Sequence, residues 1–536
     1  MKKHELINNS ITKNKKQKLP ESSIINNNDT YLNQPFEEFF NQHYTKPDFI
    51  STFNTAFRKS LPCKDDFATV LEKPYPIFIL ENIFSIEFLK SVKCTLEKGT
   101  IYNKKSNDLY EFYQSDDLKN SLEPDLIKLR ETIYSPQFIQ LISELTGIKL
   151  DNTPDLSAHQ YAYGNYLLCH DDDIKDVDSS HGRRIAFIFY LVDENWNKED
   201  GGALEFFDTD ELGQPKNIIQ SIIPKWNSMA FFELSPTSYH QVSEVLTKSK
   251  IRLSVSGWFH GSLRTRLSNA NFNSPTSFPQ LLDNNFHNQY PTINDLVNPS
   301  YLSKQGKKEI LKVLRREASI ELQQFLKEEV YRKLMDSLNN AKWEENPVGP
   351  PFIRRYHLIN NEKPSQPFHQ LIYNFFTSTV FTTYLSEITR YEISSLSSEI
   401  RQFLPGDYTM IHDQALDHEG LDIVLHCIED ENWNPKWQGG THYVANELEL
   451  LTLWPKKNTL SIVVRDEGTA RFVKYINREV KYPRREMSFI YIENEENNDD
   501  DYCDEENNSD DDSYEGNNDF DEENNPDDVS YDEEKK

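Results

Sequence analysis

The sequence predicts a mainly β protein with flanking helices, in which a β-rich domain occurs twice. Residues 157–259 contain seven or eight short apolar runs separated by turn residues, with no helical pattern between them. Such strand bundles form a sandwich, jelly roll or barrel rather than a parallel α/β sheet. A second β-rich stretch, residues 351–492, repeats motifs of the first in the same order. Aromatic residues make up 12% of the chain, which suits well-packed β-domains.

The charge of the chain is concentrated at one end. The 536 residues carry 58 Lys and Arg against 87 Asp and Glu, a formal net charge of −29. Half of the 44 residues in 493–536 are acidic, and removing this segment leaves a net charge of only −9. We therefore expect a globular body with a disordered acidic tail that could attract basic protein partners. Direct nucleic-acid binding is not expected, because phosphate neutralisation requires clustered Lys and Arg.

Cysteine usage and hydropathy favour a soluble intracellular protein. The five cysteines are scattered, odd in number and form no CxxC pair, which argues against a disulfide framework and a zinc finger. The longest apolar run, residues 185–192, is far shorter than the roughly 20 residues that span a bilayer. The N-terminal segment is polar and contains no apolar signal-peptide core. No membrane partner is expected.

The order of the patterns along the chain predicts the domain organisation. Helical periodicity covers residues 85–98, with Ser85 at the N-cap position, and residues 135–145. A Pro- and Asn-rich connector follows the first β-rich stretch, and residues 307–340 again have helical periodicity. The predicted segments are a disordered N-terminal segment (1–34), a β-domain with flanking helices (35–262), a linker and helical connector (263–342), a second β-domain (343–492) and a disordered acidic tail (493–536).

The second β-domain repeats the first. The segment LVDENWNKEDGGALEFF at residues 191–207 is matched by CIEDENWNPKWQGGTHYV at residues 427–444, with five identical consecutive residues and a shared Gly pair. Further along, IIPKWNSMAFFE matches LWPKKNTLSIVV, which aligns Asn227 with Asn458. Because the identity, the Gly pair and the strand order recur together, we infer a duplicated β-domain.

The motif LLCHDDD carries the clearest chemistry, with His170 and Asp172 two residues apart in an expected strand. Alternate residues of a strand face the same side, so both side chains can aim at one point. His240 is the candidate third ligand, and two histidines with a carboxylate are what a facial iron(II) triad needs. Twelve residues further on, Arg252 and Ser254 share one face of a strand, where they could hold the far end of a dicarboxylate.

Other interpretations of these residues stay open at this point. A lone His-x-Asp pair is weak evidence, and its weight comes from the order of the motifs around it. Arg252 could pair with a structural carboxylate, and a tyrosine such as Tyr161 could be a core aromatic. Three further histidines compete for the third ligand position: His159, His181 and His260.

The motifs, taken together, resemble one family closely. The run LLCHDDD…GRRIAFIFYLV…GGALEFFD…IIPKWNSMAFFELSPTSYHQVSEVL…IRLSVSGWFHG is similar to the 2-oxoglutarate- and iron-dependent ribosomal prolyl 3-hydroxylases, whose fungal members are prolyl 3,4-dihydroxylases. The resemblance covers roughly residues 38–492. It implies a double-stranded β-helix (jelly-roll) catalytic domain followed by a second, degenerate copy.

The resemblance also implies a complete site. By position, its residues are His170, Asp172 and His240 as iron ligands, Arg252 as the clamp for the 2-oxoglutarate carboxylate, and Tyr161 and Tyr190 as further cosubstrate contacts. The implied cofactors are Fe(II), 2-oxoglutarate as cosubstrate, O2, and L-ascorbate as reductant. The loop at residues 174–182 is longer than usual for the family and lies near the expected mouth of the site.

The second copy departs from the family's ligand pattern. The His-x-Asp position becomes HDQ at residues 412–414, which replaces the carboxylate by a neutral amide. The position of His240 falls on Arg471, a cation that would repel Fe(II), and Arg252 corresponds to Arg485. We therefore expect the second domain to be a scaffold or a partner-binding module without an active site of its own.

The substrate is implied by the resemblance alone. The family hydroxylates a prolyl residue, at C3 and in some members also at C4, in a decoding-centre protein of the small ribosomal subunit, which influences translation. The resemblance also favours the cytoplasm and nucleus.

The alternative enzyme is a 2-oxoglutarate oxygenase that acts on another protein or on a nucleic acid. The non-enzymatic alternative is an interaction protein that binds basic partners through its β-domains and acidic tail, but the intact Asp172 favours an enzyme.

Overall fold

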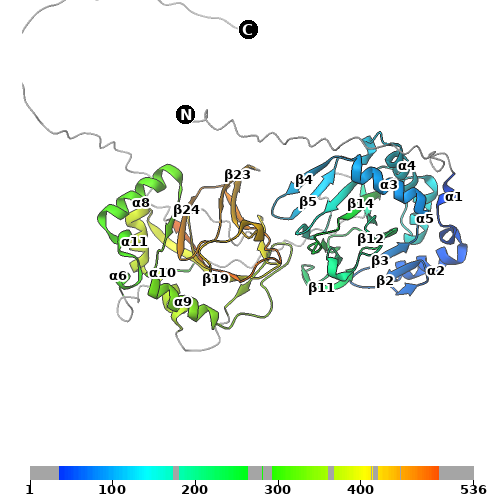
Figure 1. Cartoon of the computed structure of the whole chain (residues 1–536). Coiled ribbons are helices and arrows are strands. Elements are labelled where there is room, and N and C mark those ends of the chain that lie inside the picture. Colours follow the sequence, from blue (N-terminus) through cyan, green and yellow to red (C-terminus); the bar gives the residue numbers. More distant parts are fainter. Residues whose placement is uncertain are drawn as a thin grey trace, which may run out of the picture. The chain divides into compact units, whose positions relative to one another are not determined.

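The structure is a computed structural model that describes residues 35–172, 180–263, 280–281, 292–359, 367–411, 413, 420–446 and 448–493. These residues belong to one unit, Met1–Glu493. Its strands form antiparallel sheets in two β-rich parts, each with helices of its own (Figure 1). The mainly β class with flanking helices is thereby confirmed. The predicted segment 1–34, the predicted tail 493–536 apart from Glu493, which ends β26, and most of the loop at 174–182 lie outside the described residues.

Membrane spans were sought among the helices. No helix in the part of the chain that the structure describes is long and apolar enough to cross a membrane.

Helices pack against one face of the first β-rich part, residues 35–263. The Ser85 hydroxyl accepts a hydrogen bond from the Phe88 N–H at 3.4 Å and starts one helix, and Ser135 starts another in the same way. The helical stretches predicted at 85–98 and 135–145 are confirmed. The helices are α1 (Phe36–Phe39), α2 (Pro47–Arg58), α3 (Ile86–Lys98), α4 (Pro124–Ile133) and α5 (Pro136–Thr146).

The strands of the first part form one hydrogen-bonded sheet of 14 strands. Their order is β1-β2-β3-β12-β9-β14-β7-β5-β8-β13-β10-β11, with β4 paired to β5 and β6 paired to β14. The strands are β1 (Cys63–Lys64), β2 (Ala68–Leu71), β3 (Ile77–Glu81), β4 (Tyr102–Ser106), β5 (Tyr110–Ser115), β6 (Leu150–Asp151), β7 (Leu156–Tyr161), β8 (Tyr166–His170), β9 (His181–Tyr190), β10 (Leu204–Thr209), β11 (Pro215–Ile222), β12 (Ser228–Glu233), β13 (His240–Val242) and β14 (Arg252–Ser262).

Two apolar clusters show how this sheet folds over on itself. The odd-numbered residues 185–189 of β9 pack with the helices. The even-numbered residues 186–190 belong to a second cluster, which also contains Leu204 and Phe206 of β10. Because alternate residues of a strand face opposite sides, β9 has helices on one face and the β8, β13 and β10 half of the sheet on the other. The space between the two halves is the interior in which the site lies.

The second β-rich part, from residue 280 to residue 493, is built around a seven-stranded antiparallel sheet. Its order is β15-β19-β26-β21-β24-β16, with β18 paired to β19. A three-stranded sheet, β23-β22-β25, and the pair β17-β20 accompany it. The strands are β15 (Gln280–Leu281), β16 (Ser319–Gln323), β17 (Arg354–Arg355), β18 (His357–Leu358), β19 (Ile393–Phe403), β20 (Tyr408–Thr409), β21 (Gly420–Cys427), β22 (Thr441–Ala445), β23 (Leu448–Leu453), β24 (Thr459–Arg465), β25 (Ala470–Val473) and β26 (Arg484–Glu493).

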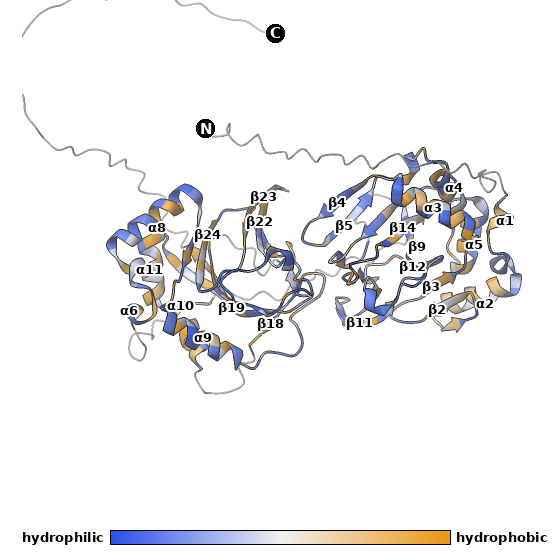
Figure 2. Ribbon diagram, viewed as in Figure 1, coloured by the Kyte–Doolittle hydropathy of each residue, from blue (hydrophilic) through white to orange (hydrophobic). Residues whose placement is uncertain are grey.

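Amphipathic helices cover one face of the seven-stranded sheet, and Figure 2 shows hydrophilic and hydrophobic residues side by side on α8 and α9. Helix α9 buries Val330, Leu334 and Leu338 in a cluster that also contains Leu425 of β21 and Phe489 of β26. The helices are α6 (Ile293–Leu296), α7 (Pro299–Leu302), α8 (Lys304–Glu317), α9 (Glu328–Asn339), α10 (Phe368–Phe376) and α11 (Thr379–Thr389).

One predicted element is corrected. The periodicity of residues 307–340 predicts helix, whereas the structure has α8, then β16, then α9. Ala318, with a φ of 54°, ends α8, and β16 then pairs with β24 at the edge of the sheet. Ile320 and Leu322 fit a helical stripe and a strand alternation equally well, so the pairing with β24 decides between them. Part of the predicted connector therefore belongs to the second sheet.

The two asparagines that the sequence aligns, Asn227 and Asn458, have the same structural role. Both have a positive φ, of 55° and 50°, just before β12 and β24. The Asn227 side chain accepts hydrogen bonds from the N–H groups of Ile83 and Phe84 at 3.0 and 3.1 Å, and donates to the Phe84 carbonyl at 2.7 Å. Asn458 accepts from the Leu326 N–H at 3.0 Å and donates to its carbonyl at 2.7 Å. A short amide that tolerates left-handed backbone explains why asparagine recurs here.

Replacing Asn227 by alanine should lower the free energy of unfolding by about 2–4 kcal/mol. The change removes three buried hydrogen bonds and leaves a residue that disfavours the left-handed conformation. Urea-induced unfolding measures the effect. The exposed Asn217→Ala variant is the control and should change stability by less than about 0.5 kcal/mol. Equal effects of the two substitutions would contradict this role for Asn227.

Candidate functional site

Three metal-ligating side chains meet in the interior of the first β-rich part. Strands β8 and β13 are neighbours, and His170 lies directly opposite His240 with ring centres 4.3 Å apart. The Asp172 carboxylate lies 3.4 Å from His170 Nε2 and 3.6 Å from His240 Nε2. The potential ligand atoms all lie within 4.8 Å of one another. The structure thus brings together the three residues that the sequence predicts.

The backbone conformation of Asp172 brings its carboxylate to this point, and here the sequence argument needs correction. Strand β8 ends at His170, so the two residues are not alternate members of one strand. Asp172 has a φ of 55°, in the left-handed region that Asp tolerates better than most residues. The indole N–H of Trp258, on β14, donates to Asp172 Oδ2 at 3.3 Å. A left-handed backbone conformation and a hydrogen bond therefore place the carboxylate, instead of strand alternation.

Backbone carbonyls orient both imidazole rings. His170 Nδ1 lies 2.7 Å from the carbonyl oxygen of Leu168, and His240 Nδ1 lies 3.0 Å from that of Ser238. A proton on each Nδ1 satisfies these carbonyls and leaves both Nε2 lone pairs available on the side of Asp172. Two imidazole nitrogens and one carboxylate are a donor set that suits Fe(II). The residues present therefore fit a facial non-haem iron centre.

Charge interactions outweigh burial at the triad. Burial alone would raise the pKa of Asp172, yet His170 and His240 hold it well below its ordinary value. Burial would also lower the pKa of His170, but Asp172 raises it above its usual range. The carboxylate is therefore ionised and able to bind a cation.

Arg252, at the start of β14, lies in the same interior and is only 1% exposed. Its Nε donates to the Gly202 carbonyl at 2.7 Å and its Nη1 to Ser254 Oγ at 3.4 Å. The guanidinium carbon lies 5.0 and 5.2 Å from the ring centres of Tyr161 and Tyr190. Arg252 Nη2 and Tyr190 Oη have no hydrogen-bond partner among the described residues. Buried polar atoms of this kind indicate where the carboxylate of a ligand would bind.

The glycine beside Arg252 is needed for packing. Gly202 has a φ of 66°, and a Cβ there would lie 2.8 Å from Arg252 Cδ. A larger residue would therefore both strain the backbone and displace the guanidinium. Close packing against Arg252 therefore explains the glycine at position 202 of the first repeat, which belongs to the Gly pair found in both repeats.

A pocket of about 220 Å³ joins the triad to Arg252. Its walls are mostly apolar and include Phe112, Leu167, Leu204 and Trp258. Apolar walls exclude water and strengthen the interactions between charged groups inside. The pocket can hold a small dicarboxylate between Arg252 and the triad.

The histidines that compete for the third ligand position are engaged elsewhere. His159 lines the pocket, but burial lowers its pKa to about 4 and it is not one of the converging groups. His181 contacts Asp151, and His260 contacts Asp155. Within the described residues, the triad is the one set of three His, Cys, Asp or Glu side chains close enough to share a metal ion.

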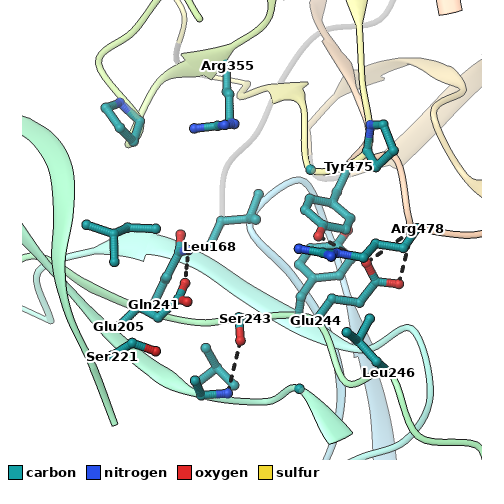
Figure 3. A pocket seen from close by; sticks show the side chains of 18 of the residues that line it. Leu168, Glu205, Ser221, Gln241, Ser243, Glu244, Leu246, Arg355, Tyr475 and Arg478 are labelled. Carbon is teal, nitrogen blue, oxygen red and sulfur yellow. Dashed lines mark hydrogen bonds between the residues drawn. The ribbon is translucent and has the colours of Figure 1, made fainter. Parts of the chain in front are cut away.

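A second pocket, of about 370 Å³, lies on the opposite face of β10 and β13 (Figure 3). Glu205 and Gln241, which are paired across the ladder, line it and share a hydrogen bond of 2.7 Å. Arg355 and Arg478 of the second β-rich part contribute the opposite charge to its lining. The walls of this pocket are both polar and apolar, and they contain no converging metal ligands among the described residues.

Glu244 connects the two β-rich parts beside this second pocket. Its carboxylate accepts hydrogen bonds from the Tyr475 hydroxyl at 3.2 Å and from the Arg478 N–H at 3.1 Å. The rings of Tyr166 and Tyr475 lie 4.2 Å apart next to it. Because Tyr166 begins β8, which ends at His170, the second part supports the strand that carries one member of the triad.

Two family models match the chain. The model of the 2OG-Fe(II) oxygenase superfamily matches residues 156–260, which include the triad and Arg252. A second model, described as oxoglutarate and iron-dependent oxygenase degradation C-term, matches residues 288–501. The fold, the site and these matches define a 2-oxoglutarate- and Fe(II)-dependent oxygenase, a class that uses Fe(II), 2-oxoglutarate and O2.

Several named prolyl hydroxylases align with most of the chain. Prolyl 3-hydroxylase OGFOD1 of Xenopus laevis is 35% identical over 468 residues, 78% of this chain and 88% of the relative. The protein of the same name from Mus musculus is 32% identical over 475 residues, 73% and 84% of the two chains. Prolyl 3,4-dihydroxylase OGFOD1 of Ostreococcus tauri is 28% identical over 517 residues, 82% and 98%. The chain belongs to the OGFOD1 family of prolyl hydroxylases.

The sequence alone does not identify some residues of the site. Phe112 and Leu167 line the pocket, but they come from β5 and β8, which are brought together only by the sheet. Trp258 lies on the same face of β14 as Arg252, so strand alternation could have indicated that Trp258 faces the site. Its hydrogen bond to Asp172 depends on the left-handed backbone of Asp172, which no sequence pattern indicates.

Glu244→Gln should change how stability depends on pH. Burial raises the pKa of Glu244 from its ordinary value of 4.5 to about 6, so folding favours the protonated carboxyl. The contribution of this group is present below pH 4.5 and is lost as the pH rises toward 6, at a cost of about 2 kcal/mol. Glutamine cannot ionise, so the variant should gain about 2 kcal/mol relative to wild type between pH 4 and pH 7. Urea unfolding at both pH values measures this, and a difference independent of pH would contradict the raised pKa.

Proposed function

We propose that this protein hydroxylates a prolyl residue of a protein substrate, with iron bound by His170, Asp172 and His240. The observation that carries the proposal is the converging triad joined by an apolar pocket to the buried Arg252. The names of the relatives supply the reaction: prolyl 3-hydroxylase in the vertebrates and prolyl 3,4-dihydroxylase in Ostreococcus tauri.

Each residue of the site has a definite task. When bound, Fe(II), 2-oxoglutarate and O2 together supply the oxidation, in which the keto acid is decarboxylated to succinate and one oxygen atom enters a C–H bond. With the metal bound, His170 and His240 would offer unprotonated Nε2 atoms, and Asp172 offers the negative charge that a cation requires. Trp258 holds Asp172 in place.

Arg252 binds the far carboxylate of 2-oxoglutarate in this scheme. Its free Nη2 and the hydroxyl of Tyr190 are the groups available to that carboxylate. Tyr161, whose ring lies beside the guanidinium, forms a wall of the same cavity. A charge-assisted contact in a dry cavity fixes the orientation of the cosubstrate, so that its keto acid end faces the triad.

The pocket walls and the family both bear on the identity of the substrate. The apolar wall formed by Phe112, Leu167 and Trp258 suits a pyrrolidine ring, which has no polar group at C3 or C4. We propose a proline in a small-subunit ribosomal decoding-centre protein as the target, with hydroxylation at C3 and in some cases at C4, and an effect on translation. L-Ascorbate would keep the iron reduced, and the protein would work in the cytoplasm and nucleus. The acidic tail would attract basic partners.

We also propose that the second β-rich part is a degenerate jelly-roll copy of the first that binds no iron. Arg471 lies opposite Tyr443 in the β25–β22 ladder, as His240 lies opposite Phe206 in the β13–β10 ladder. Arg471 forms an ion pair of 3.0 Å with Asp422. A guanidinium already paired with a carboxylate cannot serve as a metal ligand. Residues 412 and 414, the other positions of this comparison, lie outside the described residues.

Asp172→Ala should reduce peptide-stimulated succinate release to background, because it removes the negative ligand of the metal. The assay uses a synthetic proline-containing peptide from a small-subunit ribosomal decoding-centre protein, with mass spectrometry of the peptide. Asp171→Ala removes the same charge one residue away, where the carboxylate is not one of the converging ligand groups, and should stay within about twofold of wild type. Turnover by the Asp172 variant would overturn the ligand assignment.

Arg252→Lys should raise the KM for 2-oxoglutarate by about 10- to 100-fold, since an ammonium cannot reproduce the forked contact of a guanidinium. Steady-state kinetics at saturating peptide measure this. The control is Arg184→Lys on β9. The Arg184 guanidinium lies 2.8 Å from the Glu233 carboxylate and does not line the pocket, so this variant should leave the KM unchanged. An unchanged KM in the Arg252 variant would show that another group binds the cosubstrate carboxylate.

A further inference from the structure

The position of Arg183 depends on an irregularity where β9 pairs with β14. The pairing is regular as far as Ile185, and the next pair is Arg183 with His260, so Arg184 is an extra residue on β9. A β-bulge of this kind changes which face the following side chains occupy, and bulges beside active sites often redirect a side chain. Arg183 therefore lies on the face that carries Trp258, whereas alternation from Ile185 would turn it toward the helices.

Arg183 stacks on the indole of Trp258. Its guanidinium carbon lies 3.4 Å from the centre of that ring, which is contact distance for a planar cation on an aromatic face. The indole N–H of the same ring donates to Asp172 Oδ2 at 3.3 Å. Trp258 also lines the pocket, so protein atoms support the indole from the side of Arg183. Only the indole therefore separates the guanidinium from a member of the triad.

The carboxylate of Asp155, just before β7, holds the guanidinium in its stacked position. It accepts hydrogen bonds from Arg183 Nε at 2.8 Å and from Arg183 Nη2 at 3.3 Å. His260 Nε2 lies 3.0 Å from the same carboxylate. Burial would raise the pKa of Asp155, yet His260 and Arg183 hold it below its ordinary value, so the carboxylate stays ionised. This forked contact fixes the plane of the guanidinium, and with it the plane of the indole.

Asp172 depends on such support more than the other two members of the triad do. His170 and His240 belong to paired strands, and backbone carbonyls orient both rings. Asp172 follows the end of β8 and has a left-handed backbone. Its hydrogen bond from Trp258 is therefore the contact through which Arg183 acts on the metal site. Partners that orient a metal ligand typically change metal affinity by about 10- to 100-fold.

We propose that Arg183 is a positioning residue of the iron centre, which holds the indole of Trp258 against Asp172. The inference rests on the proposed function in that the triad is taken to bind a divalent metal ion. Arg183 does not line the pocket, which separates its role from that of Arg252. Without the stacked guanidinium the indole moves, and the Asp172 carboxylate turns away from the two histidines.

Equilibrium dialysis of the full chain with Mn(II) tests the proposal without turnover. Mn(II) stands next to Fe(II) in the order of affinities for such ligands. Asp172→Ala defines the background, which includes ions attracted by the acidic residues 493–536. Arg183→Met should weaken Mn(II) binding about 10-fold, and Trp258→Phe, which removes the indole N–H, should weaken it by a similar factor. The double variant should bind no more weakly than Trp258→Phe alone, since both changes act through one hydrogen bond.

The matched control is Arg184→Met, which removes the neighbouring arginine of the bulge and its 2.8 Å ion pair with Glu233. It should keep the Mn(II) affinity within about twofold of wild type. Thermal unfolding of both arginine variants shows whether their losses of stability are comparable. Asp155→Asn gives a second route to the same effect, because it weakens the forked contact while Arg183 and Trp258 stay in the chain. This variant should also weaken Mn(II) binding.

The outcomes separate this inference from the proposed function. If wild type and Asp172→Ala bind Mn(II) equally, the triad is not a metal site, and the proposed function fails together with the inference. If the triad binds Mn(II) but Arg183→Met matches wild type, only the positioning role fails. A loss of about 100-fold in the double variant would show that Arg183 and Trp258 act independently. A loss in Arg184→Met equal to that in Arg183→Met would show general destabilisation and would also overturn the role.

Discussion

The antiparallel pairing of β8 with β13 is the constraint on which the rest of the site depends. It places His170 across from His240, two residues that are 70 positions apart in the chain. The register is protected by burial, because a slip of one residue would turn the imidazole outward and bring Gln241, which lines the second pocket, into the interior. Once the two rings face each other, only the Asp172 carboxylate has to be added, and its left-handed backbone and the indole of Trp258 hold it in place.

Local patterns explain what the sequence could predict. Strand alternation, serine caps and the His-x-Asp motif each depend on residues close together in the chain, so the mainly β class, two helices and the triad could be predicted. The route of Asp172 to the site could not, since it depends on a left-handed φ and on a hydrogen bond from β14. The same holds for β16, whose apolar residues fit either periodicity until β24 pairs with them. The adjacent Arg484 and Arg485 allowed two alignments, and only the ladder shows which one faces inward.

The two sheet interiors treat buried charge in different ways. In the first, the charged groups are few and converge on a pocket, so ligands from outside complete their bonding. In the second, arginines and carboxylates from five strands neutralise one another, and the Arg484 guanidinium also lies 5.0 Å from the ring centre of Phe403. A buried cation is tolerated only when it is paired or hydrogen-bonded, which accounts for the ion pairs of the second interior.

The contact between Tyr166 and Tyr475, together with the hydrogen bonds of Glu244, has a consequence for cooperativity. Strand β8 is supported from behind by the second β-rich part, so we expect unfolding of the second part to destabilise this strand. Damage to the second part therefore reaches the site as increased motion of His170 at the end of β8. Such an enzyme can lose turnover because the strand that carries His170 becomes more mobile, even when the residues of the triad are unchanged. Substitutions in the second β-rich part, far from the site, can therefore cause partial loss of function.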